Sequence, residues 1–405
     1  MKKIILISSG QPSLNPRLVK EVDALVDNGY KVMVLYAYWN EWGTKFDKEL
    51  IAGKKWEAIR IGGDPVQQPT TYFFSRLIHK LAKVLNKASN GRIMAEWAIA
   101  RSGYFLIRAA KKHSADLYIG HNIGALAATV KAAKANGTSC GFDAEDFHRN
   151  ELSNDAHNHD VIIKSKLEEL YIPQVDYLTT SSQQIAEAYQ QLFPGKSSVI
   201  IRNVFPKNDT IKAPVANLGN PIKLFWFSQT IGLNRGLDNL MKALQLLKDQ
   251  PFELHLLGNL SEDIKNILLS HKVKSIHFHS PIYSEELLVF ASQFDIGLAL
   301  EPAFSINNDL ALSNKIFTYL QGGLAIVASD TSAQHQFMEQ YPFIGKVFQK
   351  QDPQSLADAL MYYHQHRDKL LETRAAALKL AHEELNWEKE SQKFLTQVKQ
   401  ILNDN

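Results

Sequence analysis

Short apolar runs rich in β-branched residues alternate along the chain with stretches in which apolar residues recur at helical spacing. Alternation of this kind is typical of parallel strands joined by helices that cover both faces of a sheet. The pattern therefore predicts a doubly wound α/β fold. In the first half of the chain it predicts a helix over about 17–28, ended by Gly29, and strands over 3–8, 31–36, 117–119, 139–143, 177–180 and 198–201.

A segment of linker composition interrupts this alternation. Residues 206–221 contain three prolines together with Asn, Gly, Lys and Asp, and they show no apolar period. The pattern then restarts, which predicts two Rossmann-like domains, 1–205 and 222–385. The charged end of the chain, 368–405, is predicted to be helical, and its last part, 386–405, packs on the second domain or crosses back to the first. The second domain is predicted to hold strands over 222–227, 253–257, 276–278, 296–300 and 325–328, and helices over 236–248, 284–294, 315–320 and 355–366.

Composition narrows the function classes. A length of 405 residues fits two or three domains of about 150 residues, and a net charge of +3 does not indicate a nucleic-acid-binding protein. The single cysteine, Cys140, excludes an intramolecular disulfide and a multi-cysteine metal site, and it favours a reducing, cytoplasmic compartment. No apolar run approaches the ~18–20 residues of a spanning helix. Any membrane contact is therefore expected to be peripheral.

One region is strongly basic. Residues 71–112 carry nine Lys or Arg residues against one acid, Glu96, a local charge of about +8. Arg76, Lys80, Lys83 and Lys87 recur at helical spacing beside an apolar stripe formed by Phe73, Leu77, Leu81 and Leu85, with Phe74 and Ile78. A basic amphipathic helix suits an anionic membrane surface, and 71–92 is predicted to dock there, at the inner face of the cell membrane. The alternative is a helix that buries the stripe inside its own domain.

The loop after the first predicted strand contains Gly10, which allows a sharp turn, and it ends in a helix start. Asn15 is the predicted N-cap, Pro16 occupies the first helical position, and Arg17 follows in the first turn. Arg17 is either a contact for an anionic ligand or a surface arginine. The loop lacks the GxGxxG spacing, so a dinucleotide cofactor is not supported.

Two further loops of the first domain are predicted to begin with polar clusters. They are Gly120-His121-Asn122 and Asp143-Ala144-Glu145-Asp146-Phe147-His148. Carboxylates and an imidazole at the carboxyl end of a strand can orient hydroxyl groups of a ligand or act as a general base. A metal site from His121, Asp143, Glu145 and His148 has no helix-borne ligand spacing to support it, so no metal ion is expected. His148, next to Arg149, is expected at the surface.

The second domain carries two segments suited to an anion. Its first strand runs into Ser228-Gln229-Thr230-Ile231-Gly232-Leu233-Asn234-Arg235-Gly236, a glycine-containing loop that ends in Arg235 at a helix start. Backbone N–H groups and the helix dipole favour a diphosphate there, and Arg235 adds a bidentate donor. Later, Ser313 or Asn314 is expected to cap a helix whose first turn contains Lys315, a cation that the dipole disfavours unless an anion is near. For both cations the alternative is a solvated surface side chain.

These segments, in this order, resemble the retaining, nucleotide-sugar-dependent glycosyltransferases of the GT-B fold, in particular glycosyltransferase family 4. The resemblance rests on NPRLVKEVDALVDNGYKV, SQTIGLNRGL, LLGN at 256–259 and SNKIFTYLQGGLAIVASD, and it covers nearly the whole chain. It implies two Rossmann-like domains that face each other across a cleft. It also implies a nucleotide-diphosphate sugar as donor, a glycan or lipid-linked acceptor, retention of anomeric configuration, and no requirement for a metal ion.

The sequence departs from that family at two places. The family's basic pair for the donor diphosphate falls on Gln229 and Arg235, so only Arg235 keeps the charge. The family's two glutamates, separated by seven residues, fall on Leu310 and Thr318. Glu301, or else Asp309, is expected to replace the missing carboxylate, and Glu301 is favoured because it follows a predicted strand directly.

The resemblance assigns the remaining residues. The catalytic group is expected to be Arg235, Lys315, Glu301 and His121. The donor site is expected to be lined by Gly10, Ser228, Gln229, Gly258, His279, Pro281, Asn314 and Thr318, with His279 and Pro281 near the nucleobase. The acceptor side is expected to contain Asn15, Arg17, Glu145 and Asp146.

The expected reaction is front-face transfer, in which the leaving diphosphate helps to deprotonate the acceptor hydroxyl and Arg235 and Lys315 stabilise the charge on the leaving group. The expected role is cell-surface polysaccharide synthesis. Two alternatives remain open. One is a catalytically inactive nucleotide-sugar-binding partner subunit, which the residues at 229, 310 and 318 favour. The other is a GT-B fold UDP-sugar 2-epimerase, which would have no need of a membrane-directed helix.

Overall fold

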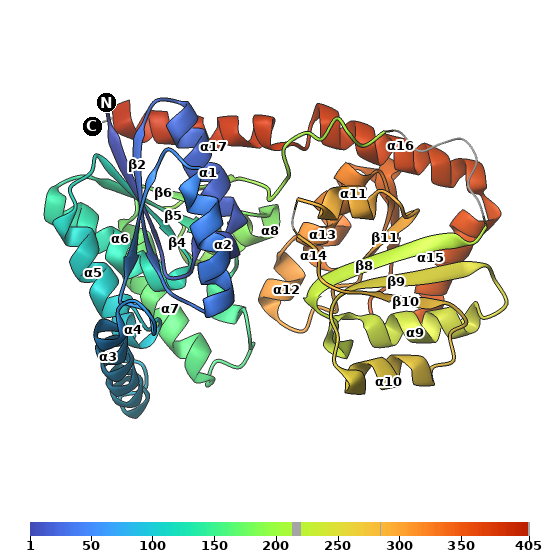
Figure 1. The fold of residues 1–405 in the computed structure, drawn as a ribbon, viewed down its shortest axis with the longest axis horizontal. Helices are drawn as coiled ribbons and strands as arrows, with labels where there is room; N and C mark the ends of the chain where they lie inside the picture. The colour runs from blue at the N-terminus through green and yellow to red at the C-terminus, as the bar shows by residue number, and fades with distance from the viewer. Residues whose placement is uncertain (213–219, 284, 404–405) are drawn as a thin grey trace. The chain divides into compact units, whose positions relative to one another are not determined.

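A computed structural model describes residues 1–212, 220–283 and 285–403. Residues 213–219 of the predicted linker, Ser284 of a predicted helix and residues 404–405 lie outside this description. The chain forms two compact units (Figure 1). The first unit comprises Met1–Arg202, Ser305–Asn307 and Ser391–Asn405, and the second comprises Asn203–Phe304 and Asn308–Glu390.

The first unit is built on a parallel seven-stranded sheet in the order β3-β2-β1-β4-β5-β6-β7. Six of its strands confirm the predicted ones to within two residues at each end. The seventh, β3, was not predicted, because this edge strand is only partly buried and its sequence EAIRI alternates with polar residues. The strands are β1 (Lys3–Ser8), β2 (Lys31–Ala37), β3 (Glu57–Ile61), β4 (Leu117–His121), β5 (Ser139–Ala144), β6 (Tyr177–Thr180) and β7 (Ser198–Ile200).

Helices lie on both sides of this sheet (Figure 1). The start of α1 is as predicted, with Asn15 as the N-cap whose side chain accepts the N–H of Leu18 and with Pro16 at the first helical position. The basic region, 71–112, forms two longer helices and one short helix, which come between β3 and β4 in the sequence. The helices are α1 (Pro16–Asp27), α2 (Glu41–Ala52), α3 (Pro69–Ala88), α4 (Ala95–Ala98), α5 (Gly103–Lys112), α6 (Ile123–Asn136), α7 (His159–Tyr171) and α8 (Gln183–Leu192).

The second unit holds a parallel six-stranded sheet in the order β10-β9-β8-β11-β12-β13. Its five predicted strands are confirmed, whereas the edge strand β13, which is short and mostly half-buried, was not predicted. The strands are β8 (Ile222–Thr230), β9 (Phe252–Asn259), β10 (Ile276–His279), β11 (Ile296–Ala299), β12 (Ala325–Ser329) and β13 (Gly345–Phe348).

The helices of the second unit include the predicted ones, although α11 is shorter than the predicted 284–294. The helical character predicted for 368–405 is confirmed over the described residues, with a break between α16 and α17. The helices that follow β8 in the chain are α9 (Leu237–Leu246), α10 (Glu262–Ser270), α11 (Leu287–Ala291), α12 (Ile306–Leu310), α13 (Asn314–Gly322), α14 (Ser332–Gln340), α15 (Pro353–Gln365), α16 (Arg367–Glu383) and α17 (Trp387–Asn403). The start of α12, up to Asn307, and most of α17, from Ser391 on, belong to the first unit.

Strand order locates the place in each unit where a ligand is expected. Consecutive residues of β1, from Ile4 to Ile7, and of β8, Phe225 and Trp226, are buried. Both faces of these two strands are therefore covered, and each strand lies inside its sheet. The order reverses between β1 and β4 in the first unit and between β8 and β11 in the second. In doubly wound sheets ligands bind beyond the carboxyl ends of the strands at such a reversal. In both units these strand ends carry the residues singled out from the sequence.

Candidate functional site

A hollow of about 280 Å³ lies at the carboxyl ends of β1 and β4 in the first unit. Its lining includes Ser9, Gly10, Asn15, Trp39 and Asn122. The Ser8 hydroxyl donates to Asn122 Oδ1 at 3.0 Å and accepts the N–H of Gly10 at 3.1 Å, which fixes the loop after β1 against the end of β4. The backbone of Asn122 has a positive φ of 70°, a conformation that is costly for a non-glycine residue and that recurs at active and ligand-binding sites.

Two residues that line the hollow have roles that the sequence did not predict. Gly10 is not among the glycines of positive φ, and an added Cβ would have 3.9 Å to its nearest neighbour, so the turn itself does not require glycine. Its small size instead keeps the hollow open. Trp39 was not singled out from the sequence, yet it is 71% exposed at the rim, and its backbone N–H is held by Gln11 Oε1 at 2.9 Å.

A buried group of four charged side chains lies beside this hollow. The Arg17 guanidinium contacts Asp143 Oδ1 at 2.6 Å and Glu21 Oε1 at 3.5 Å, and it also donates to the carbonyl of Ile201. The ring of His121 lies between the two carboxylates, with Nε2 3.1 Å from Glu21 Oε2 and Nδ1 3.3 Å from Asp143 Oδ2. All four side chains are about 1% exposed. His121 was predicted in the loop after β4, but it is the last residue of that strand. Asp143 lies in β5, which agrees with the strand predicted over 139–143.

The charges in this group support one another. Burial opposes the charge on His121, but Glu21 and Asp143 outweigh it and raise the pKa of the imidazole to about 9. Burial likewise opposes ionisation of Asp143, but Arg17 and His121 hold the pKa of that carboxyl well below its usual range. Two cations therefore balance two carboxylates. Glu21, His121 and Asp143 have the spacing of a metal-ligand set, but Arg17 and the protonated His121 already supply the positive charge that such a set needs.

This arrangement gives Arg17 internal partners rather than leaving it at the surface. Glu21, which completes the group, was not singled out from the sequence, although its spacing of four residues from Arg17 on one helix is a recognisable signal. Arg17 and His121 therefore hold the start of α1 and the ends of β4 and β5 together.

Glu145 and Asp146 follow β5 and are partly buried. Burial raises the pKa of Glu145 to about 7, although the nearby Arg17 opposes the rise. Burial also raises the pKa of Asp146, which accepts a hydrogen bond from Asn307 Nδ2 at 3.0 Å. Glu145 can thus exchange a proton near neutral pH, as a general base requires. His148 was expected at the surface, but it is buried, because its ring packs on Phe142 and faces Glu151.

In the second unit the loop after β8 presents Arg235 to solvent. Arg235 ends a short 3₁₀ turn, Leu233–Arg235, and is exposed. The following Gly236 has a φ of 82°, and a Cβ there would collide with the carbonyl oxygen of Leu300. The loop is therefore packed directly against the chain just after β11, next to Glu301.

Glu301 and Lys315 form an ion pair at the end of β11. Lys315 Nζ lies 2.6 Å from Glu301 Oε1, and the same carboxylate accepts hydrogen bonds from Ser313 Oγ at 2.8 Å and Asn308 Nδ2 at 3.3 Å. Burial opposes the charge on Glu301, but Lys315 outweighs it and lowers the pKa of the carboxyl. The anionic partner expected for Lys315 is thus supplied from within the unit. Ser313 is the N-cap residue of α13, but its hydroxyl binds Glu301 instead of capping the helix.

The two positions of the family's glutamates are occupied as follows. Thr318 is buried in the middle of α13, and Leu310 ends α12. Of the two carboxylates considered as replacements, Asp309 binds the backbone N–H and hydroxyl of Ser332 at the start of α14. Glu301 lies beside Lys315 and next to the Arg235 loop. The structure thus brings Arg235, Glu301 and Lys315 to one edge of the sheet, with the exposed Asn314 beginning α13.

The remaining predicted donor residues lie at the ends of β8, β9 and β10. Gly258 has a φ of 149°, and a Cβ there would collide with the carbonyl oxygen of Ser228, so the two strand ends are in close contact. Gln229 is exposed, and its carbonyl accepts from Asn259 Nδ2 at 2.9 Å. His279 ends β10, and its Nε2 lies 3.0 Å from His255 Nδ1. Pro281 is exposed just beyond it.

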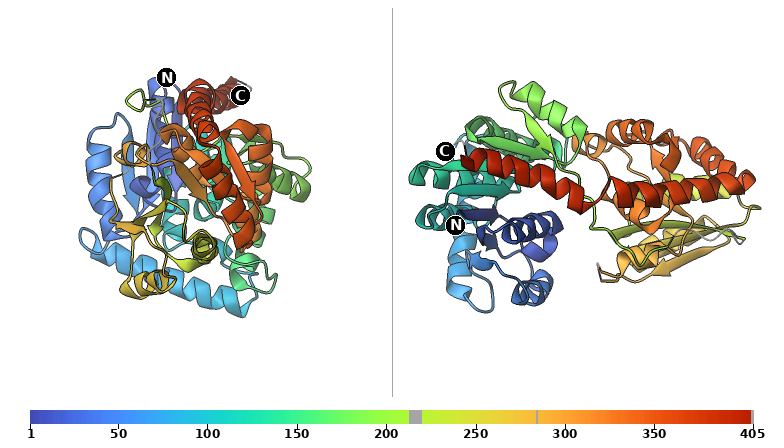
Figure 2. Two further views of the ribbon diagram at one scale, coloured as in Figure 1. Left: turned by 90° about the vertical axis from the view of Figure 1, so that its right-hand side faces the viewer. Right: turned by 90° about the horizontal axis from the view of Figure 1, so that it is seen from above.

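The basic region forms an exposed amphipathic helix, α3. Its buried residues are small or polar, namely Ser75, Ala82 and Asn86. Phe73 is 62% and Leu81 is 55% exposed, and Arg76, Lys80, Lys83 and Lys87 are exposed as well. The alternative in which α3 buries its apolar stripe within its own domain is therefore wrong. Figure 2 shows α3, in light blue along the lower edge of its left view. None of the described helices combines the length and apolar character needed to cross a bilayer.

Comparisons with known proteins agree on the fold. No protein-family description matches the sequence, and no curated protein matches it in a sequence comparison. Among solved structures, sucrose-phosphate synthase from Thermosynechococcus elongatus superposes with a TM-score of 0.70 at 14% identity, covering 100% of both chains. HepE from Anabaena, solved in complex with UDP-glucose, superposes with a TM-score of 0.68 at 14% identity over 99% of this chain and 100% of HepE.

A third similar structure is WaaB, a lipopolysaccharide outer core galactosyltransferase, with a TM-score of 0.63 at 12% identity over 98% of this chain and 99% of WaaB. The two Rossmann-like sheets of this chain thus match the GT-B fold of glycosyltransferases along its whole length.

Proposed function

We propose that this chain is a glycosyltransferase that moves a sugar from a nucleotide-diphosphate donor to a glycan or lipid-linked acceptor in cell-surface polysaccharide synthesis. The observation that carries the proposal is the likeness in fold, along nearly the whole chain, to solved glycosyltransferases, one of which was crystallised with UDP-glucose. The likeness to WaaB, which acts on lipopolysaccharide, supports the cell-surface role. At these identities the activity rests on the site as well as on the fold.

The second unit provides the donor side. Arg235 is exposed on a loop held against the end of β11 by Gly236, so it is available to a diphosphate as a bidentate donor. The loop leads directly into α9, whose N-terminal N–H groups favour an anion. Gln229 replaces the family's second cation, and Lys315 adds positive charge nearby. Glu301 holds Lys315 through the ion pair and replaces the carboxylates absent at 310 and 318.

The reaction proceeds with retention by front-face attack. The acceptor hydroxyl gives its proton to the departing diphosphate while its oxygen forms the new bond to the anomeric carbon. Negative charge grows on the diphosphate as the glycosidic bond to it breaks, and Arg235 stabilises that charge. A preorganised donor of this kind contributes roughly 3–4 kcal/mol to the lowering of the barrier. No metal ion takes part in this scheme.

The first unit provides the acceptor side. The hollow whose lining includes Asn15, Trp39 and Asn122 offers polar groups beside a flat aromatic face, a combination that suits a sugar ring. Gly10, in the same lining, keeps its expected place next to the donor. Glu145, which follows β5 and whose pKa burial raises to about 7, orients an acceptor hydroxyl, while the proton goes to the departing diphosphate. His121 and Arg17 support this side by fixing the strand ends, and Asp146 lies beside Glu145 in the same turn.

The exposed stripe of α3 supports a peripheral membrane role. Phe73, Phe74, Leu77, Leu81 and Leu85 are each more than 40% exposed beside four cations. Such a surface binds anionic lipids by burying its apolar side chains and pairing its charges with the headgroups. Binding of α3 to the membrane brings the enzyme to a lipid-linked acceptor at the cytoplasmic face.

A second candidate function is a nucleotide-sugar-binding subunit without catalysis. The observations that favour it are the buried Thr318 and the aliphatic Leu310, where the family has carboxylates. Both functions predict donor binding, but only the transferase predicts turnover.

Donor binding is tested by thermal unfolding of the purified chain with UDP-, GDP-, ADP- and dTDP-sugars. A ligand at 100 times its dissociation constant adds about 2.7 kcal/mol to the free energy of unfolding. We expect one nucleotide class to raise the melting temperature. Stabilisation by none of them, at millimolar concentration, would contradict both candidate functions.

A further inference from the structure

Three histidines and a glutamate gather at one edge of the second sheet. In β9, Glu253 and His255 are two residues apart and so project from the same face. In the neighbouring edge strand β10, His277 is paired in register with His255, and His279 follows two residues later. Strand register alone therefore brings these four side chains together. None of them except His279 has a role in the proposed transfer reaction.

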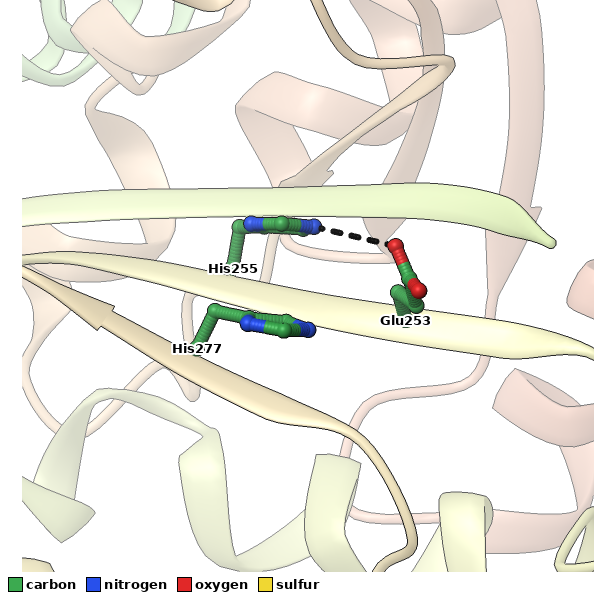
Figure 3. A group of neighbouring side chains, drawn as sticks. All are labelled: Glu253, His255 and His277. Atoms are coloured by element: carbon green, nitrogen blue, oxygen red, sulfur yellow. Dashed lines mark ion pairs between the residues drawn. The ribbon is translucent and has the colours of Figure 1, made fainter.

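The rings are arranged in parallel. His255 and His277 stack with their centroids 4.5 Å apart and an angle of 13° between their planes. Figure 3 shows both rings pointing the same way along the sheet, with the Glu253 carboxylate at their outer end. His255 Nε2 lies 3.6 Å from Glu253 Oε2. One nitrogen from each ring and a carboxylate oxygen lie within 4.8 Å of one another.

His255 is the decisive side chain. It is only 9% exposed, and its Nε2 has no hydrogen-bond partner among the described residues. Its other nitrogen, Nδ1, lies 3.0 Å from His279 Nε2. If Nδ1 donates its proton to His279, the lone pair of Nε2 points toward the carboxylate of Glu253. A metal-bound histidine has this pattern, in which one nitrogen binds the ion while the other donates to an outer partner.

We propose that Glu253, His255 and His277 bind a divalent transition-metal ion of the zinc class, with His279 as the outer partner of His255. Imidazole nitrogens with one carboxylate suit Zn²⁺, Cu²⁺ or Ni²⁺ better than Mg²⁺ or Ca²⁺. Zn²⁺ takes nitrogen at about 2.0–2.1 Å and tetrahedral geometry, so the His277 and Glu253 side chains turn toward His255 when the ion binds, which leaves a fourth position for water or another ligand. His277 Nε2, now 3.0 Å from Ser275 Oγ, exchanges that contact for the ion if it is the ligating nitrogen. This proposal differs from the sequence-based expectation that the chain has no metal site, and it does not depend on the proposed function.

The test is Zn²⁺ binding to the full chain, measured by competition with a chromogenic chelator and by elemental analysis after dialysis. We expect the wild-type chain to bind a single equivalent. His277→Asn and Glu253→Gln alter side chains at the surface or partly buried, so the fold is expected to persist, as circular dichroism without metal will show. Each is expected to weaken Zn²⁺ binding by more than about tenfold, since even outer partners of a metal site cost about 10- to 100-fold.

His157→Asn is the matched control, because His157 is an exposed histidine of the first unit. It is expected to bind Zn²⁺ as the wild type does, and Zn²⁺ is expected to raise the melting temperature of both but not of the His277 variant. Equal affinity in wild type, His277→Asn and Glu253→Gln would overturn the proposal, as would the absence of binding by the wild type.

Discussion

At the scale of single residues, the buried charges of the first unit show how the strand ends beside the hollow are held in place. Arg17, Glu21, His121 and Asp143 come from α1, β4 and β5, and each is matched by a charge of the opposite sign. Removing one partner from such a group leaves an uncompensated buried charge, which typically costs about 3–5 kcal/mol. The group therefore fixes the strand ends at which the hollow forms.

The first prediction concerns the pH dependence of this group. The pKa of His121 is about 9 in the folded chain against 6.5 ordinarily, so its protonated form stabilises the fold below pH 6.5. That stabilisation decreases from pH 6.5 and is lost as the pH rises through about 9. We expect His121→Gln to lower the free energy of unfolding more at pH 6 than at pH 9.5, as measured by urea unfolding at both values.

The control for this prediction is His157→Gln, which alters an exposed histidine. Its effect on the free energy of unfolding is expected to be small and the same at both pH values. A destabilisation by His121→Gln that is equal at pH 6 and pH 9.5 would show that the imidazole is uncharged in the folded chain.

The partners in this group illustrate what sequence alone can show. Asn15 as N-cap and Pro16 at the first helical position were predicted because helix starts depend on local side chains. The pairing of Arg17 with Asp143 joins residues 126 positions apart. It depends on β1, β4 and β5 lying side by side, which no local pattern reveals.

At the scale of elements, the loops that follow the strands carry the proposed chemistry. The segment from Gly232 to Gly236 offers a matched pair of tests. Gly236 has a positive φ and lies against the Leu300 carbonyl, whereas Gly232 has an extended backbone with no atom within 4 Å of an added Cβ. The backbone therefore requires glycine at position 236 but accepts another residue at position 232.

We expect Gly236→Ala to destabilise the second unit by more than about 1–2 kcal/mol, the cost of the left-handed conformation alone, and to displace the loop that carries Arg235 from the Leu300 carbonyl. Gly232→Ala is expected to leave the melting temperature within a degree or two of the wild type, as typical surface substitutions do. Differential scanning calorimetry measures both. Equal melting temperatures for the two variants would contradict the packing of the loop on β11.

The amphipathic helix α3 is tested by vesicle binding. We expect a variant in which Arg76, Lys80, Lys83 and Lys87 are all replaced by Glu to lose co-sedimentation with anionic vesicles. Each cation near the membrane surface contributes about 1 kcal/mol to the binding free energy. Phe74→Ser is expected to weaken binding through the apolar stripe.

Phe343→Ser is the matched control, because Phe343 is similarly exposed, at 50%, but belongs to the second unit and not to α3. It is expected to bind vesicles as the wild type does. Unchanged binding by the charge-reversal variant would exclude α3 as the membrane surface.

The spacing of residues in α3 shows that the helix is amphipathic but does not show which way its apolar face turns. A stripe that faces the core and a stripe that faces solvent have the same spacing, and only the packing of Ser75, Ala82 and Asn86 against the body of the unit separates them. The histidine group of β9 and β10 escaped notice for a similar reason. Its members are spread over two strands and become neighbours only through register.

At the scale of the whole molecule, the central strands of both sheets were predictable because they are continuous apolar runs buried on both faces. The edge strands β3 and β13 were not, because a half-buried strand mixes polar and apolar residues. The two sheet orders and the likeness to solved glycosyltransferases then give the fold. The departures at Gln229, Leu310 and Thr318 make turnover, rather than binding, the central question.

The most direct measurement is release of nucleoside diphosphate from the stabilising nucleotide sugar in the presence of a lipid-linked or oligosaccharide acceptor, by the wild type and by Arg235→Ala. We expect turnover by the wild type and a loss of about 10²- to 10³-fold in Arg235→Ala, the usual cost of removing a group that stabilises transition-state charge, with an unchanged melting temperature. Equal rates for the two proteins would contradict the donor site, and donor binding without turnover by the wild type would contradict the transferase.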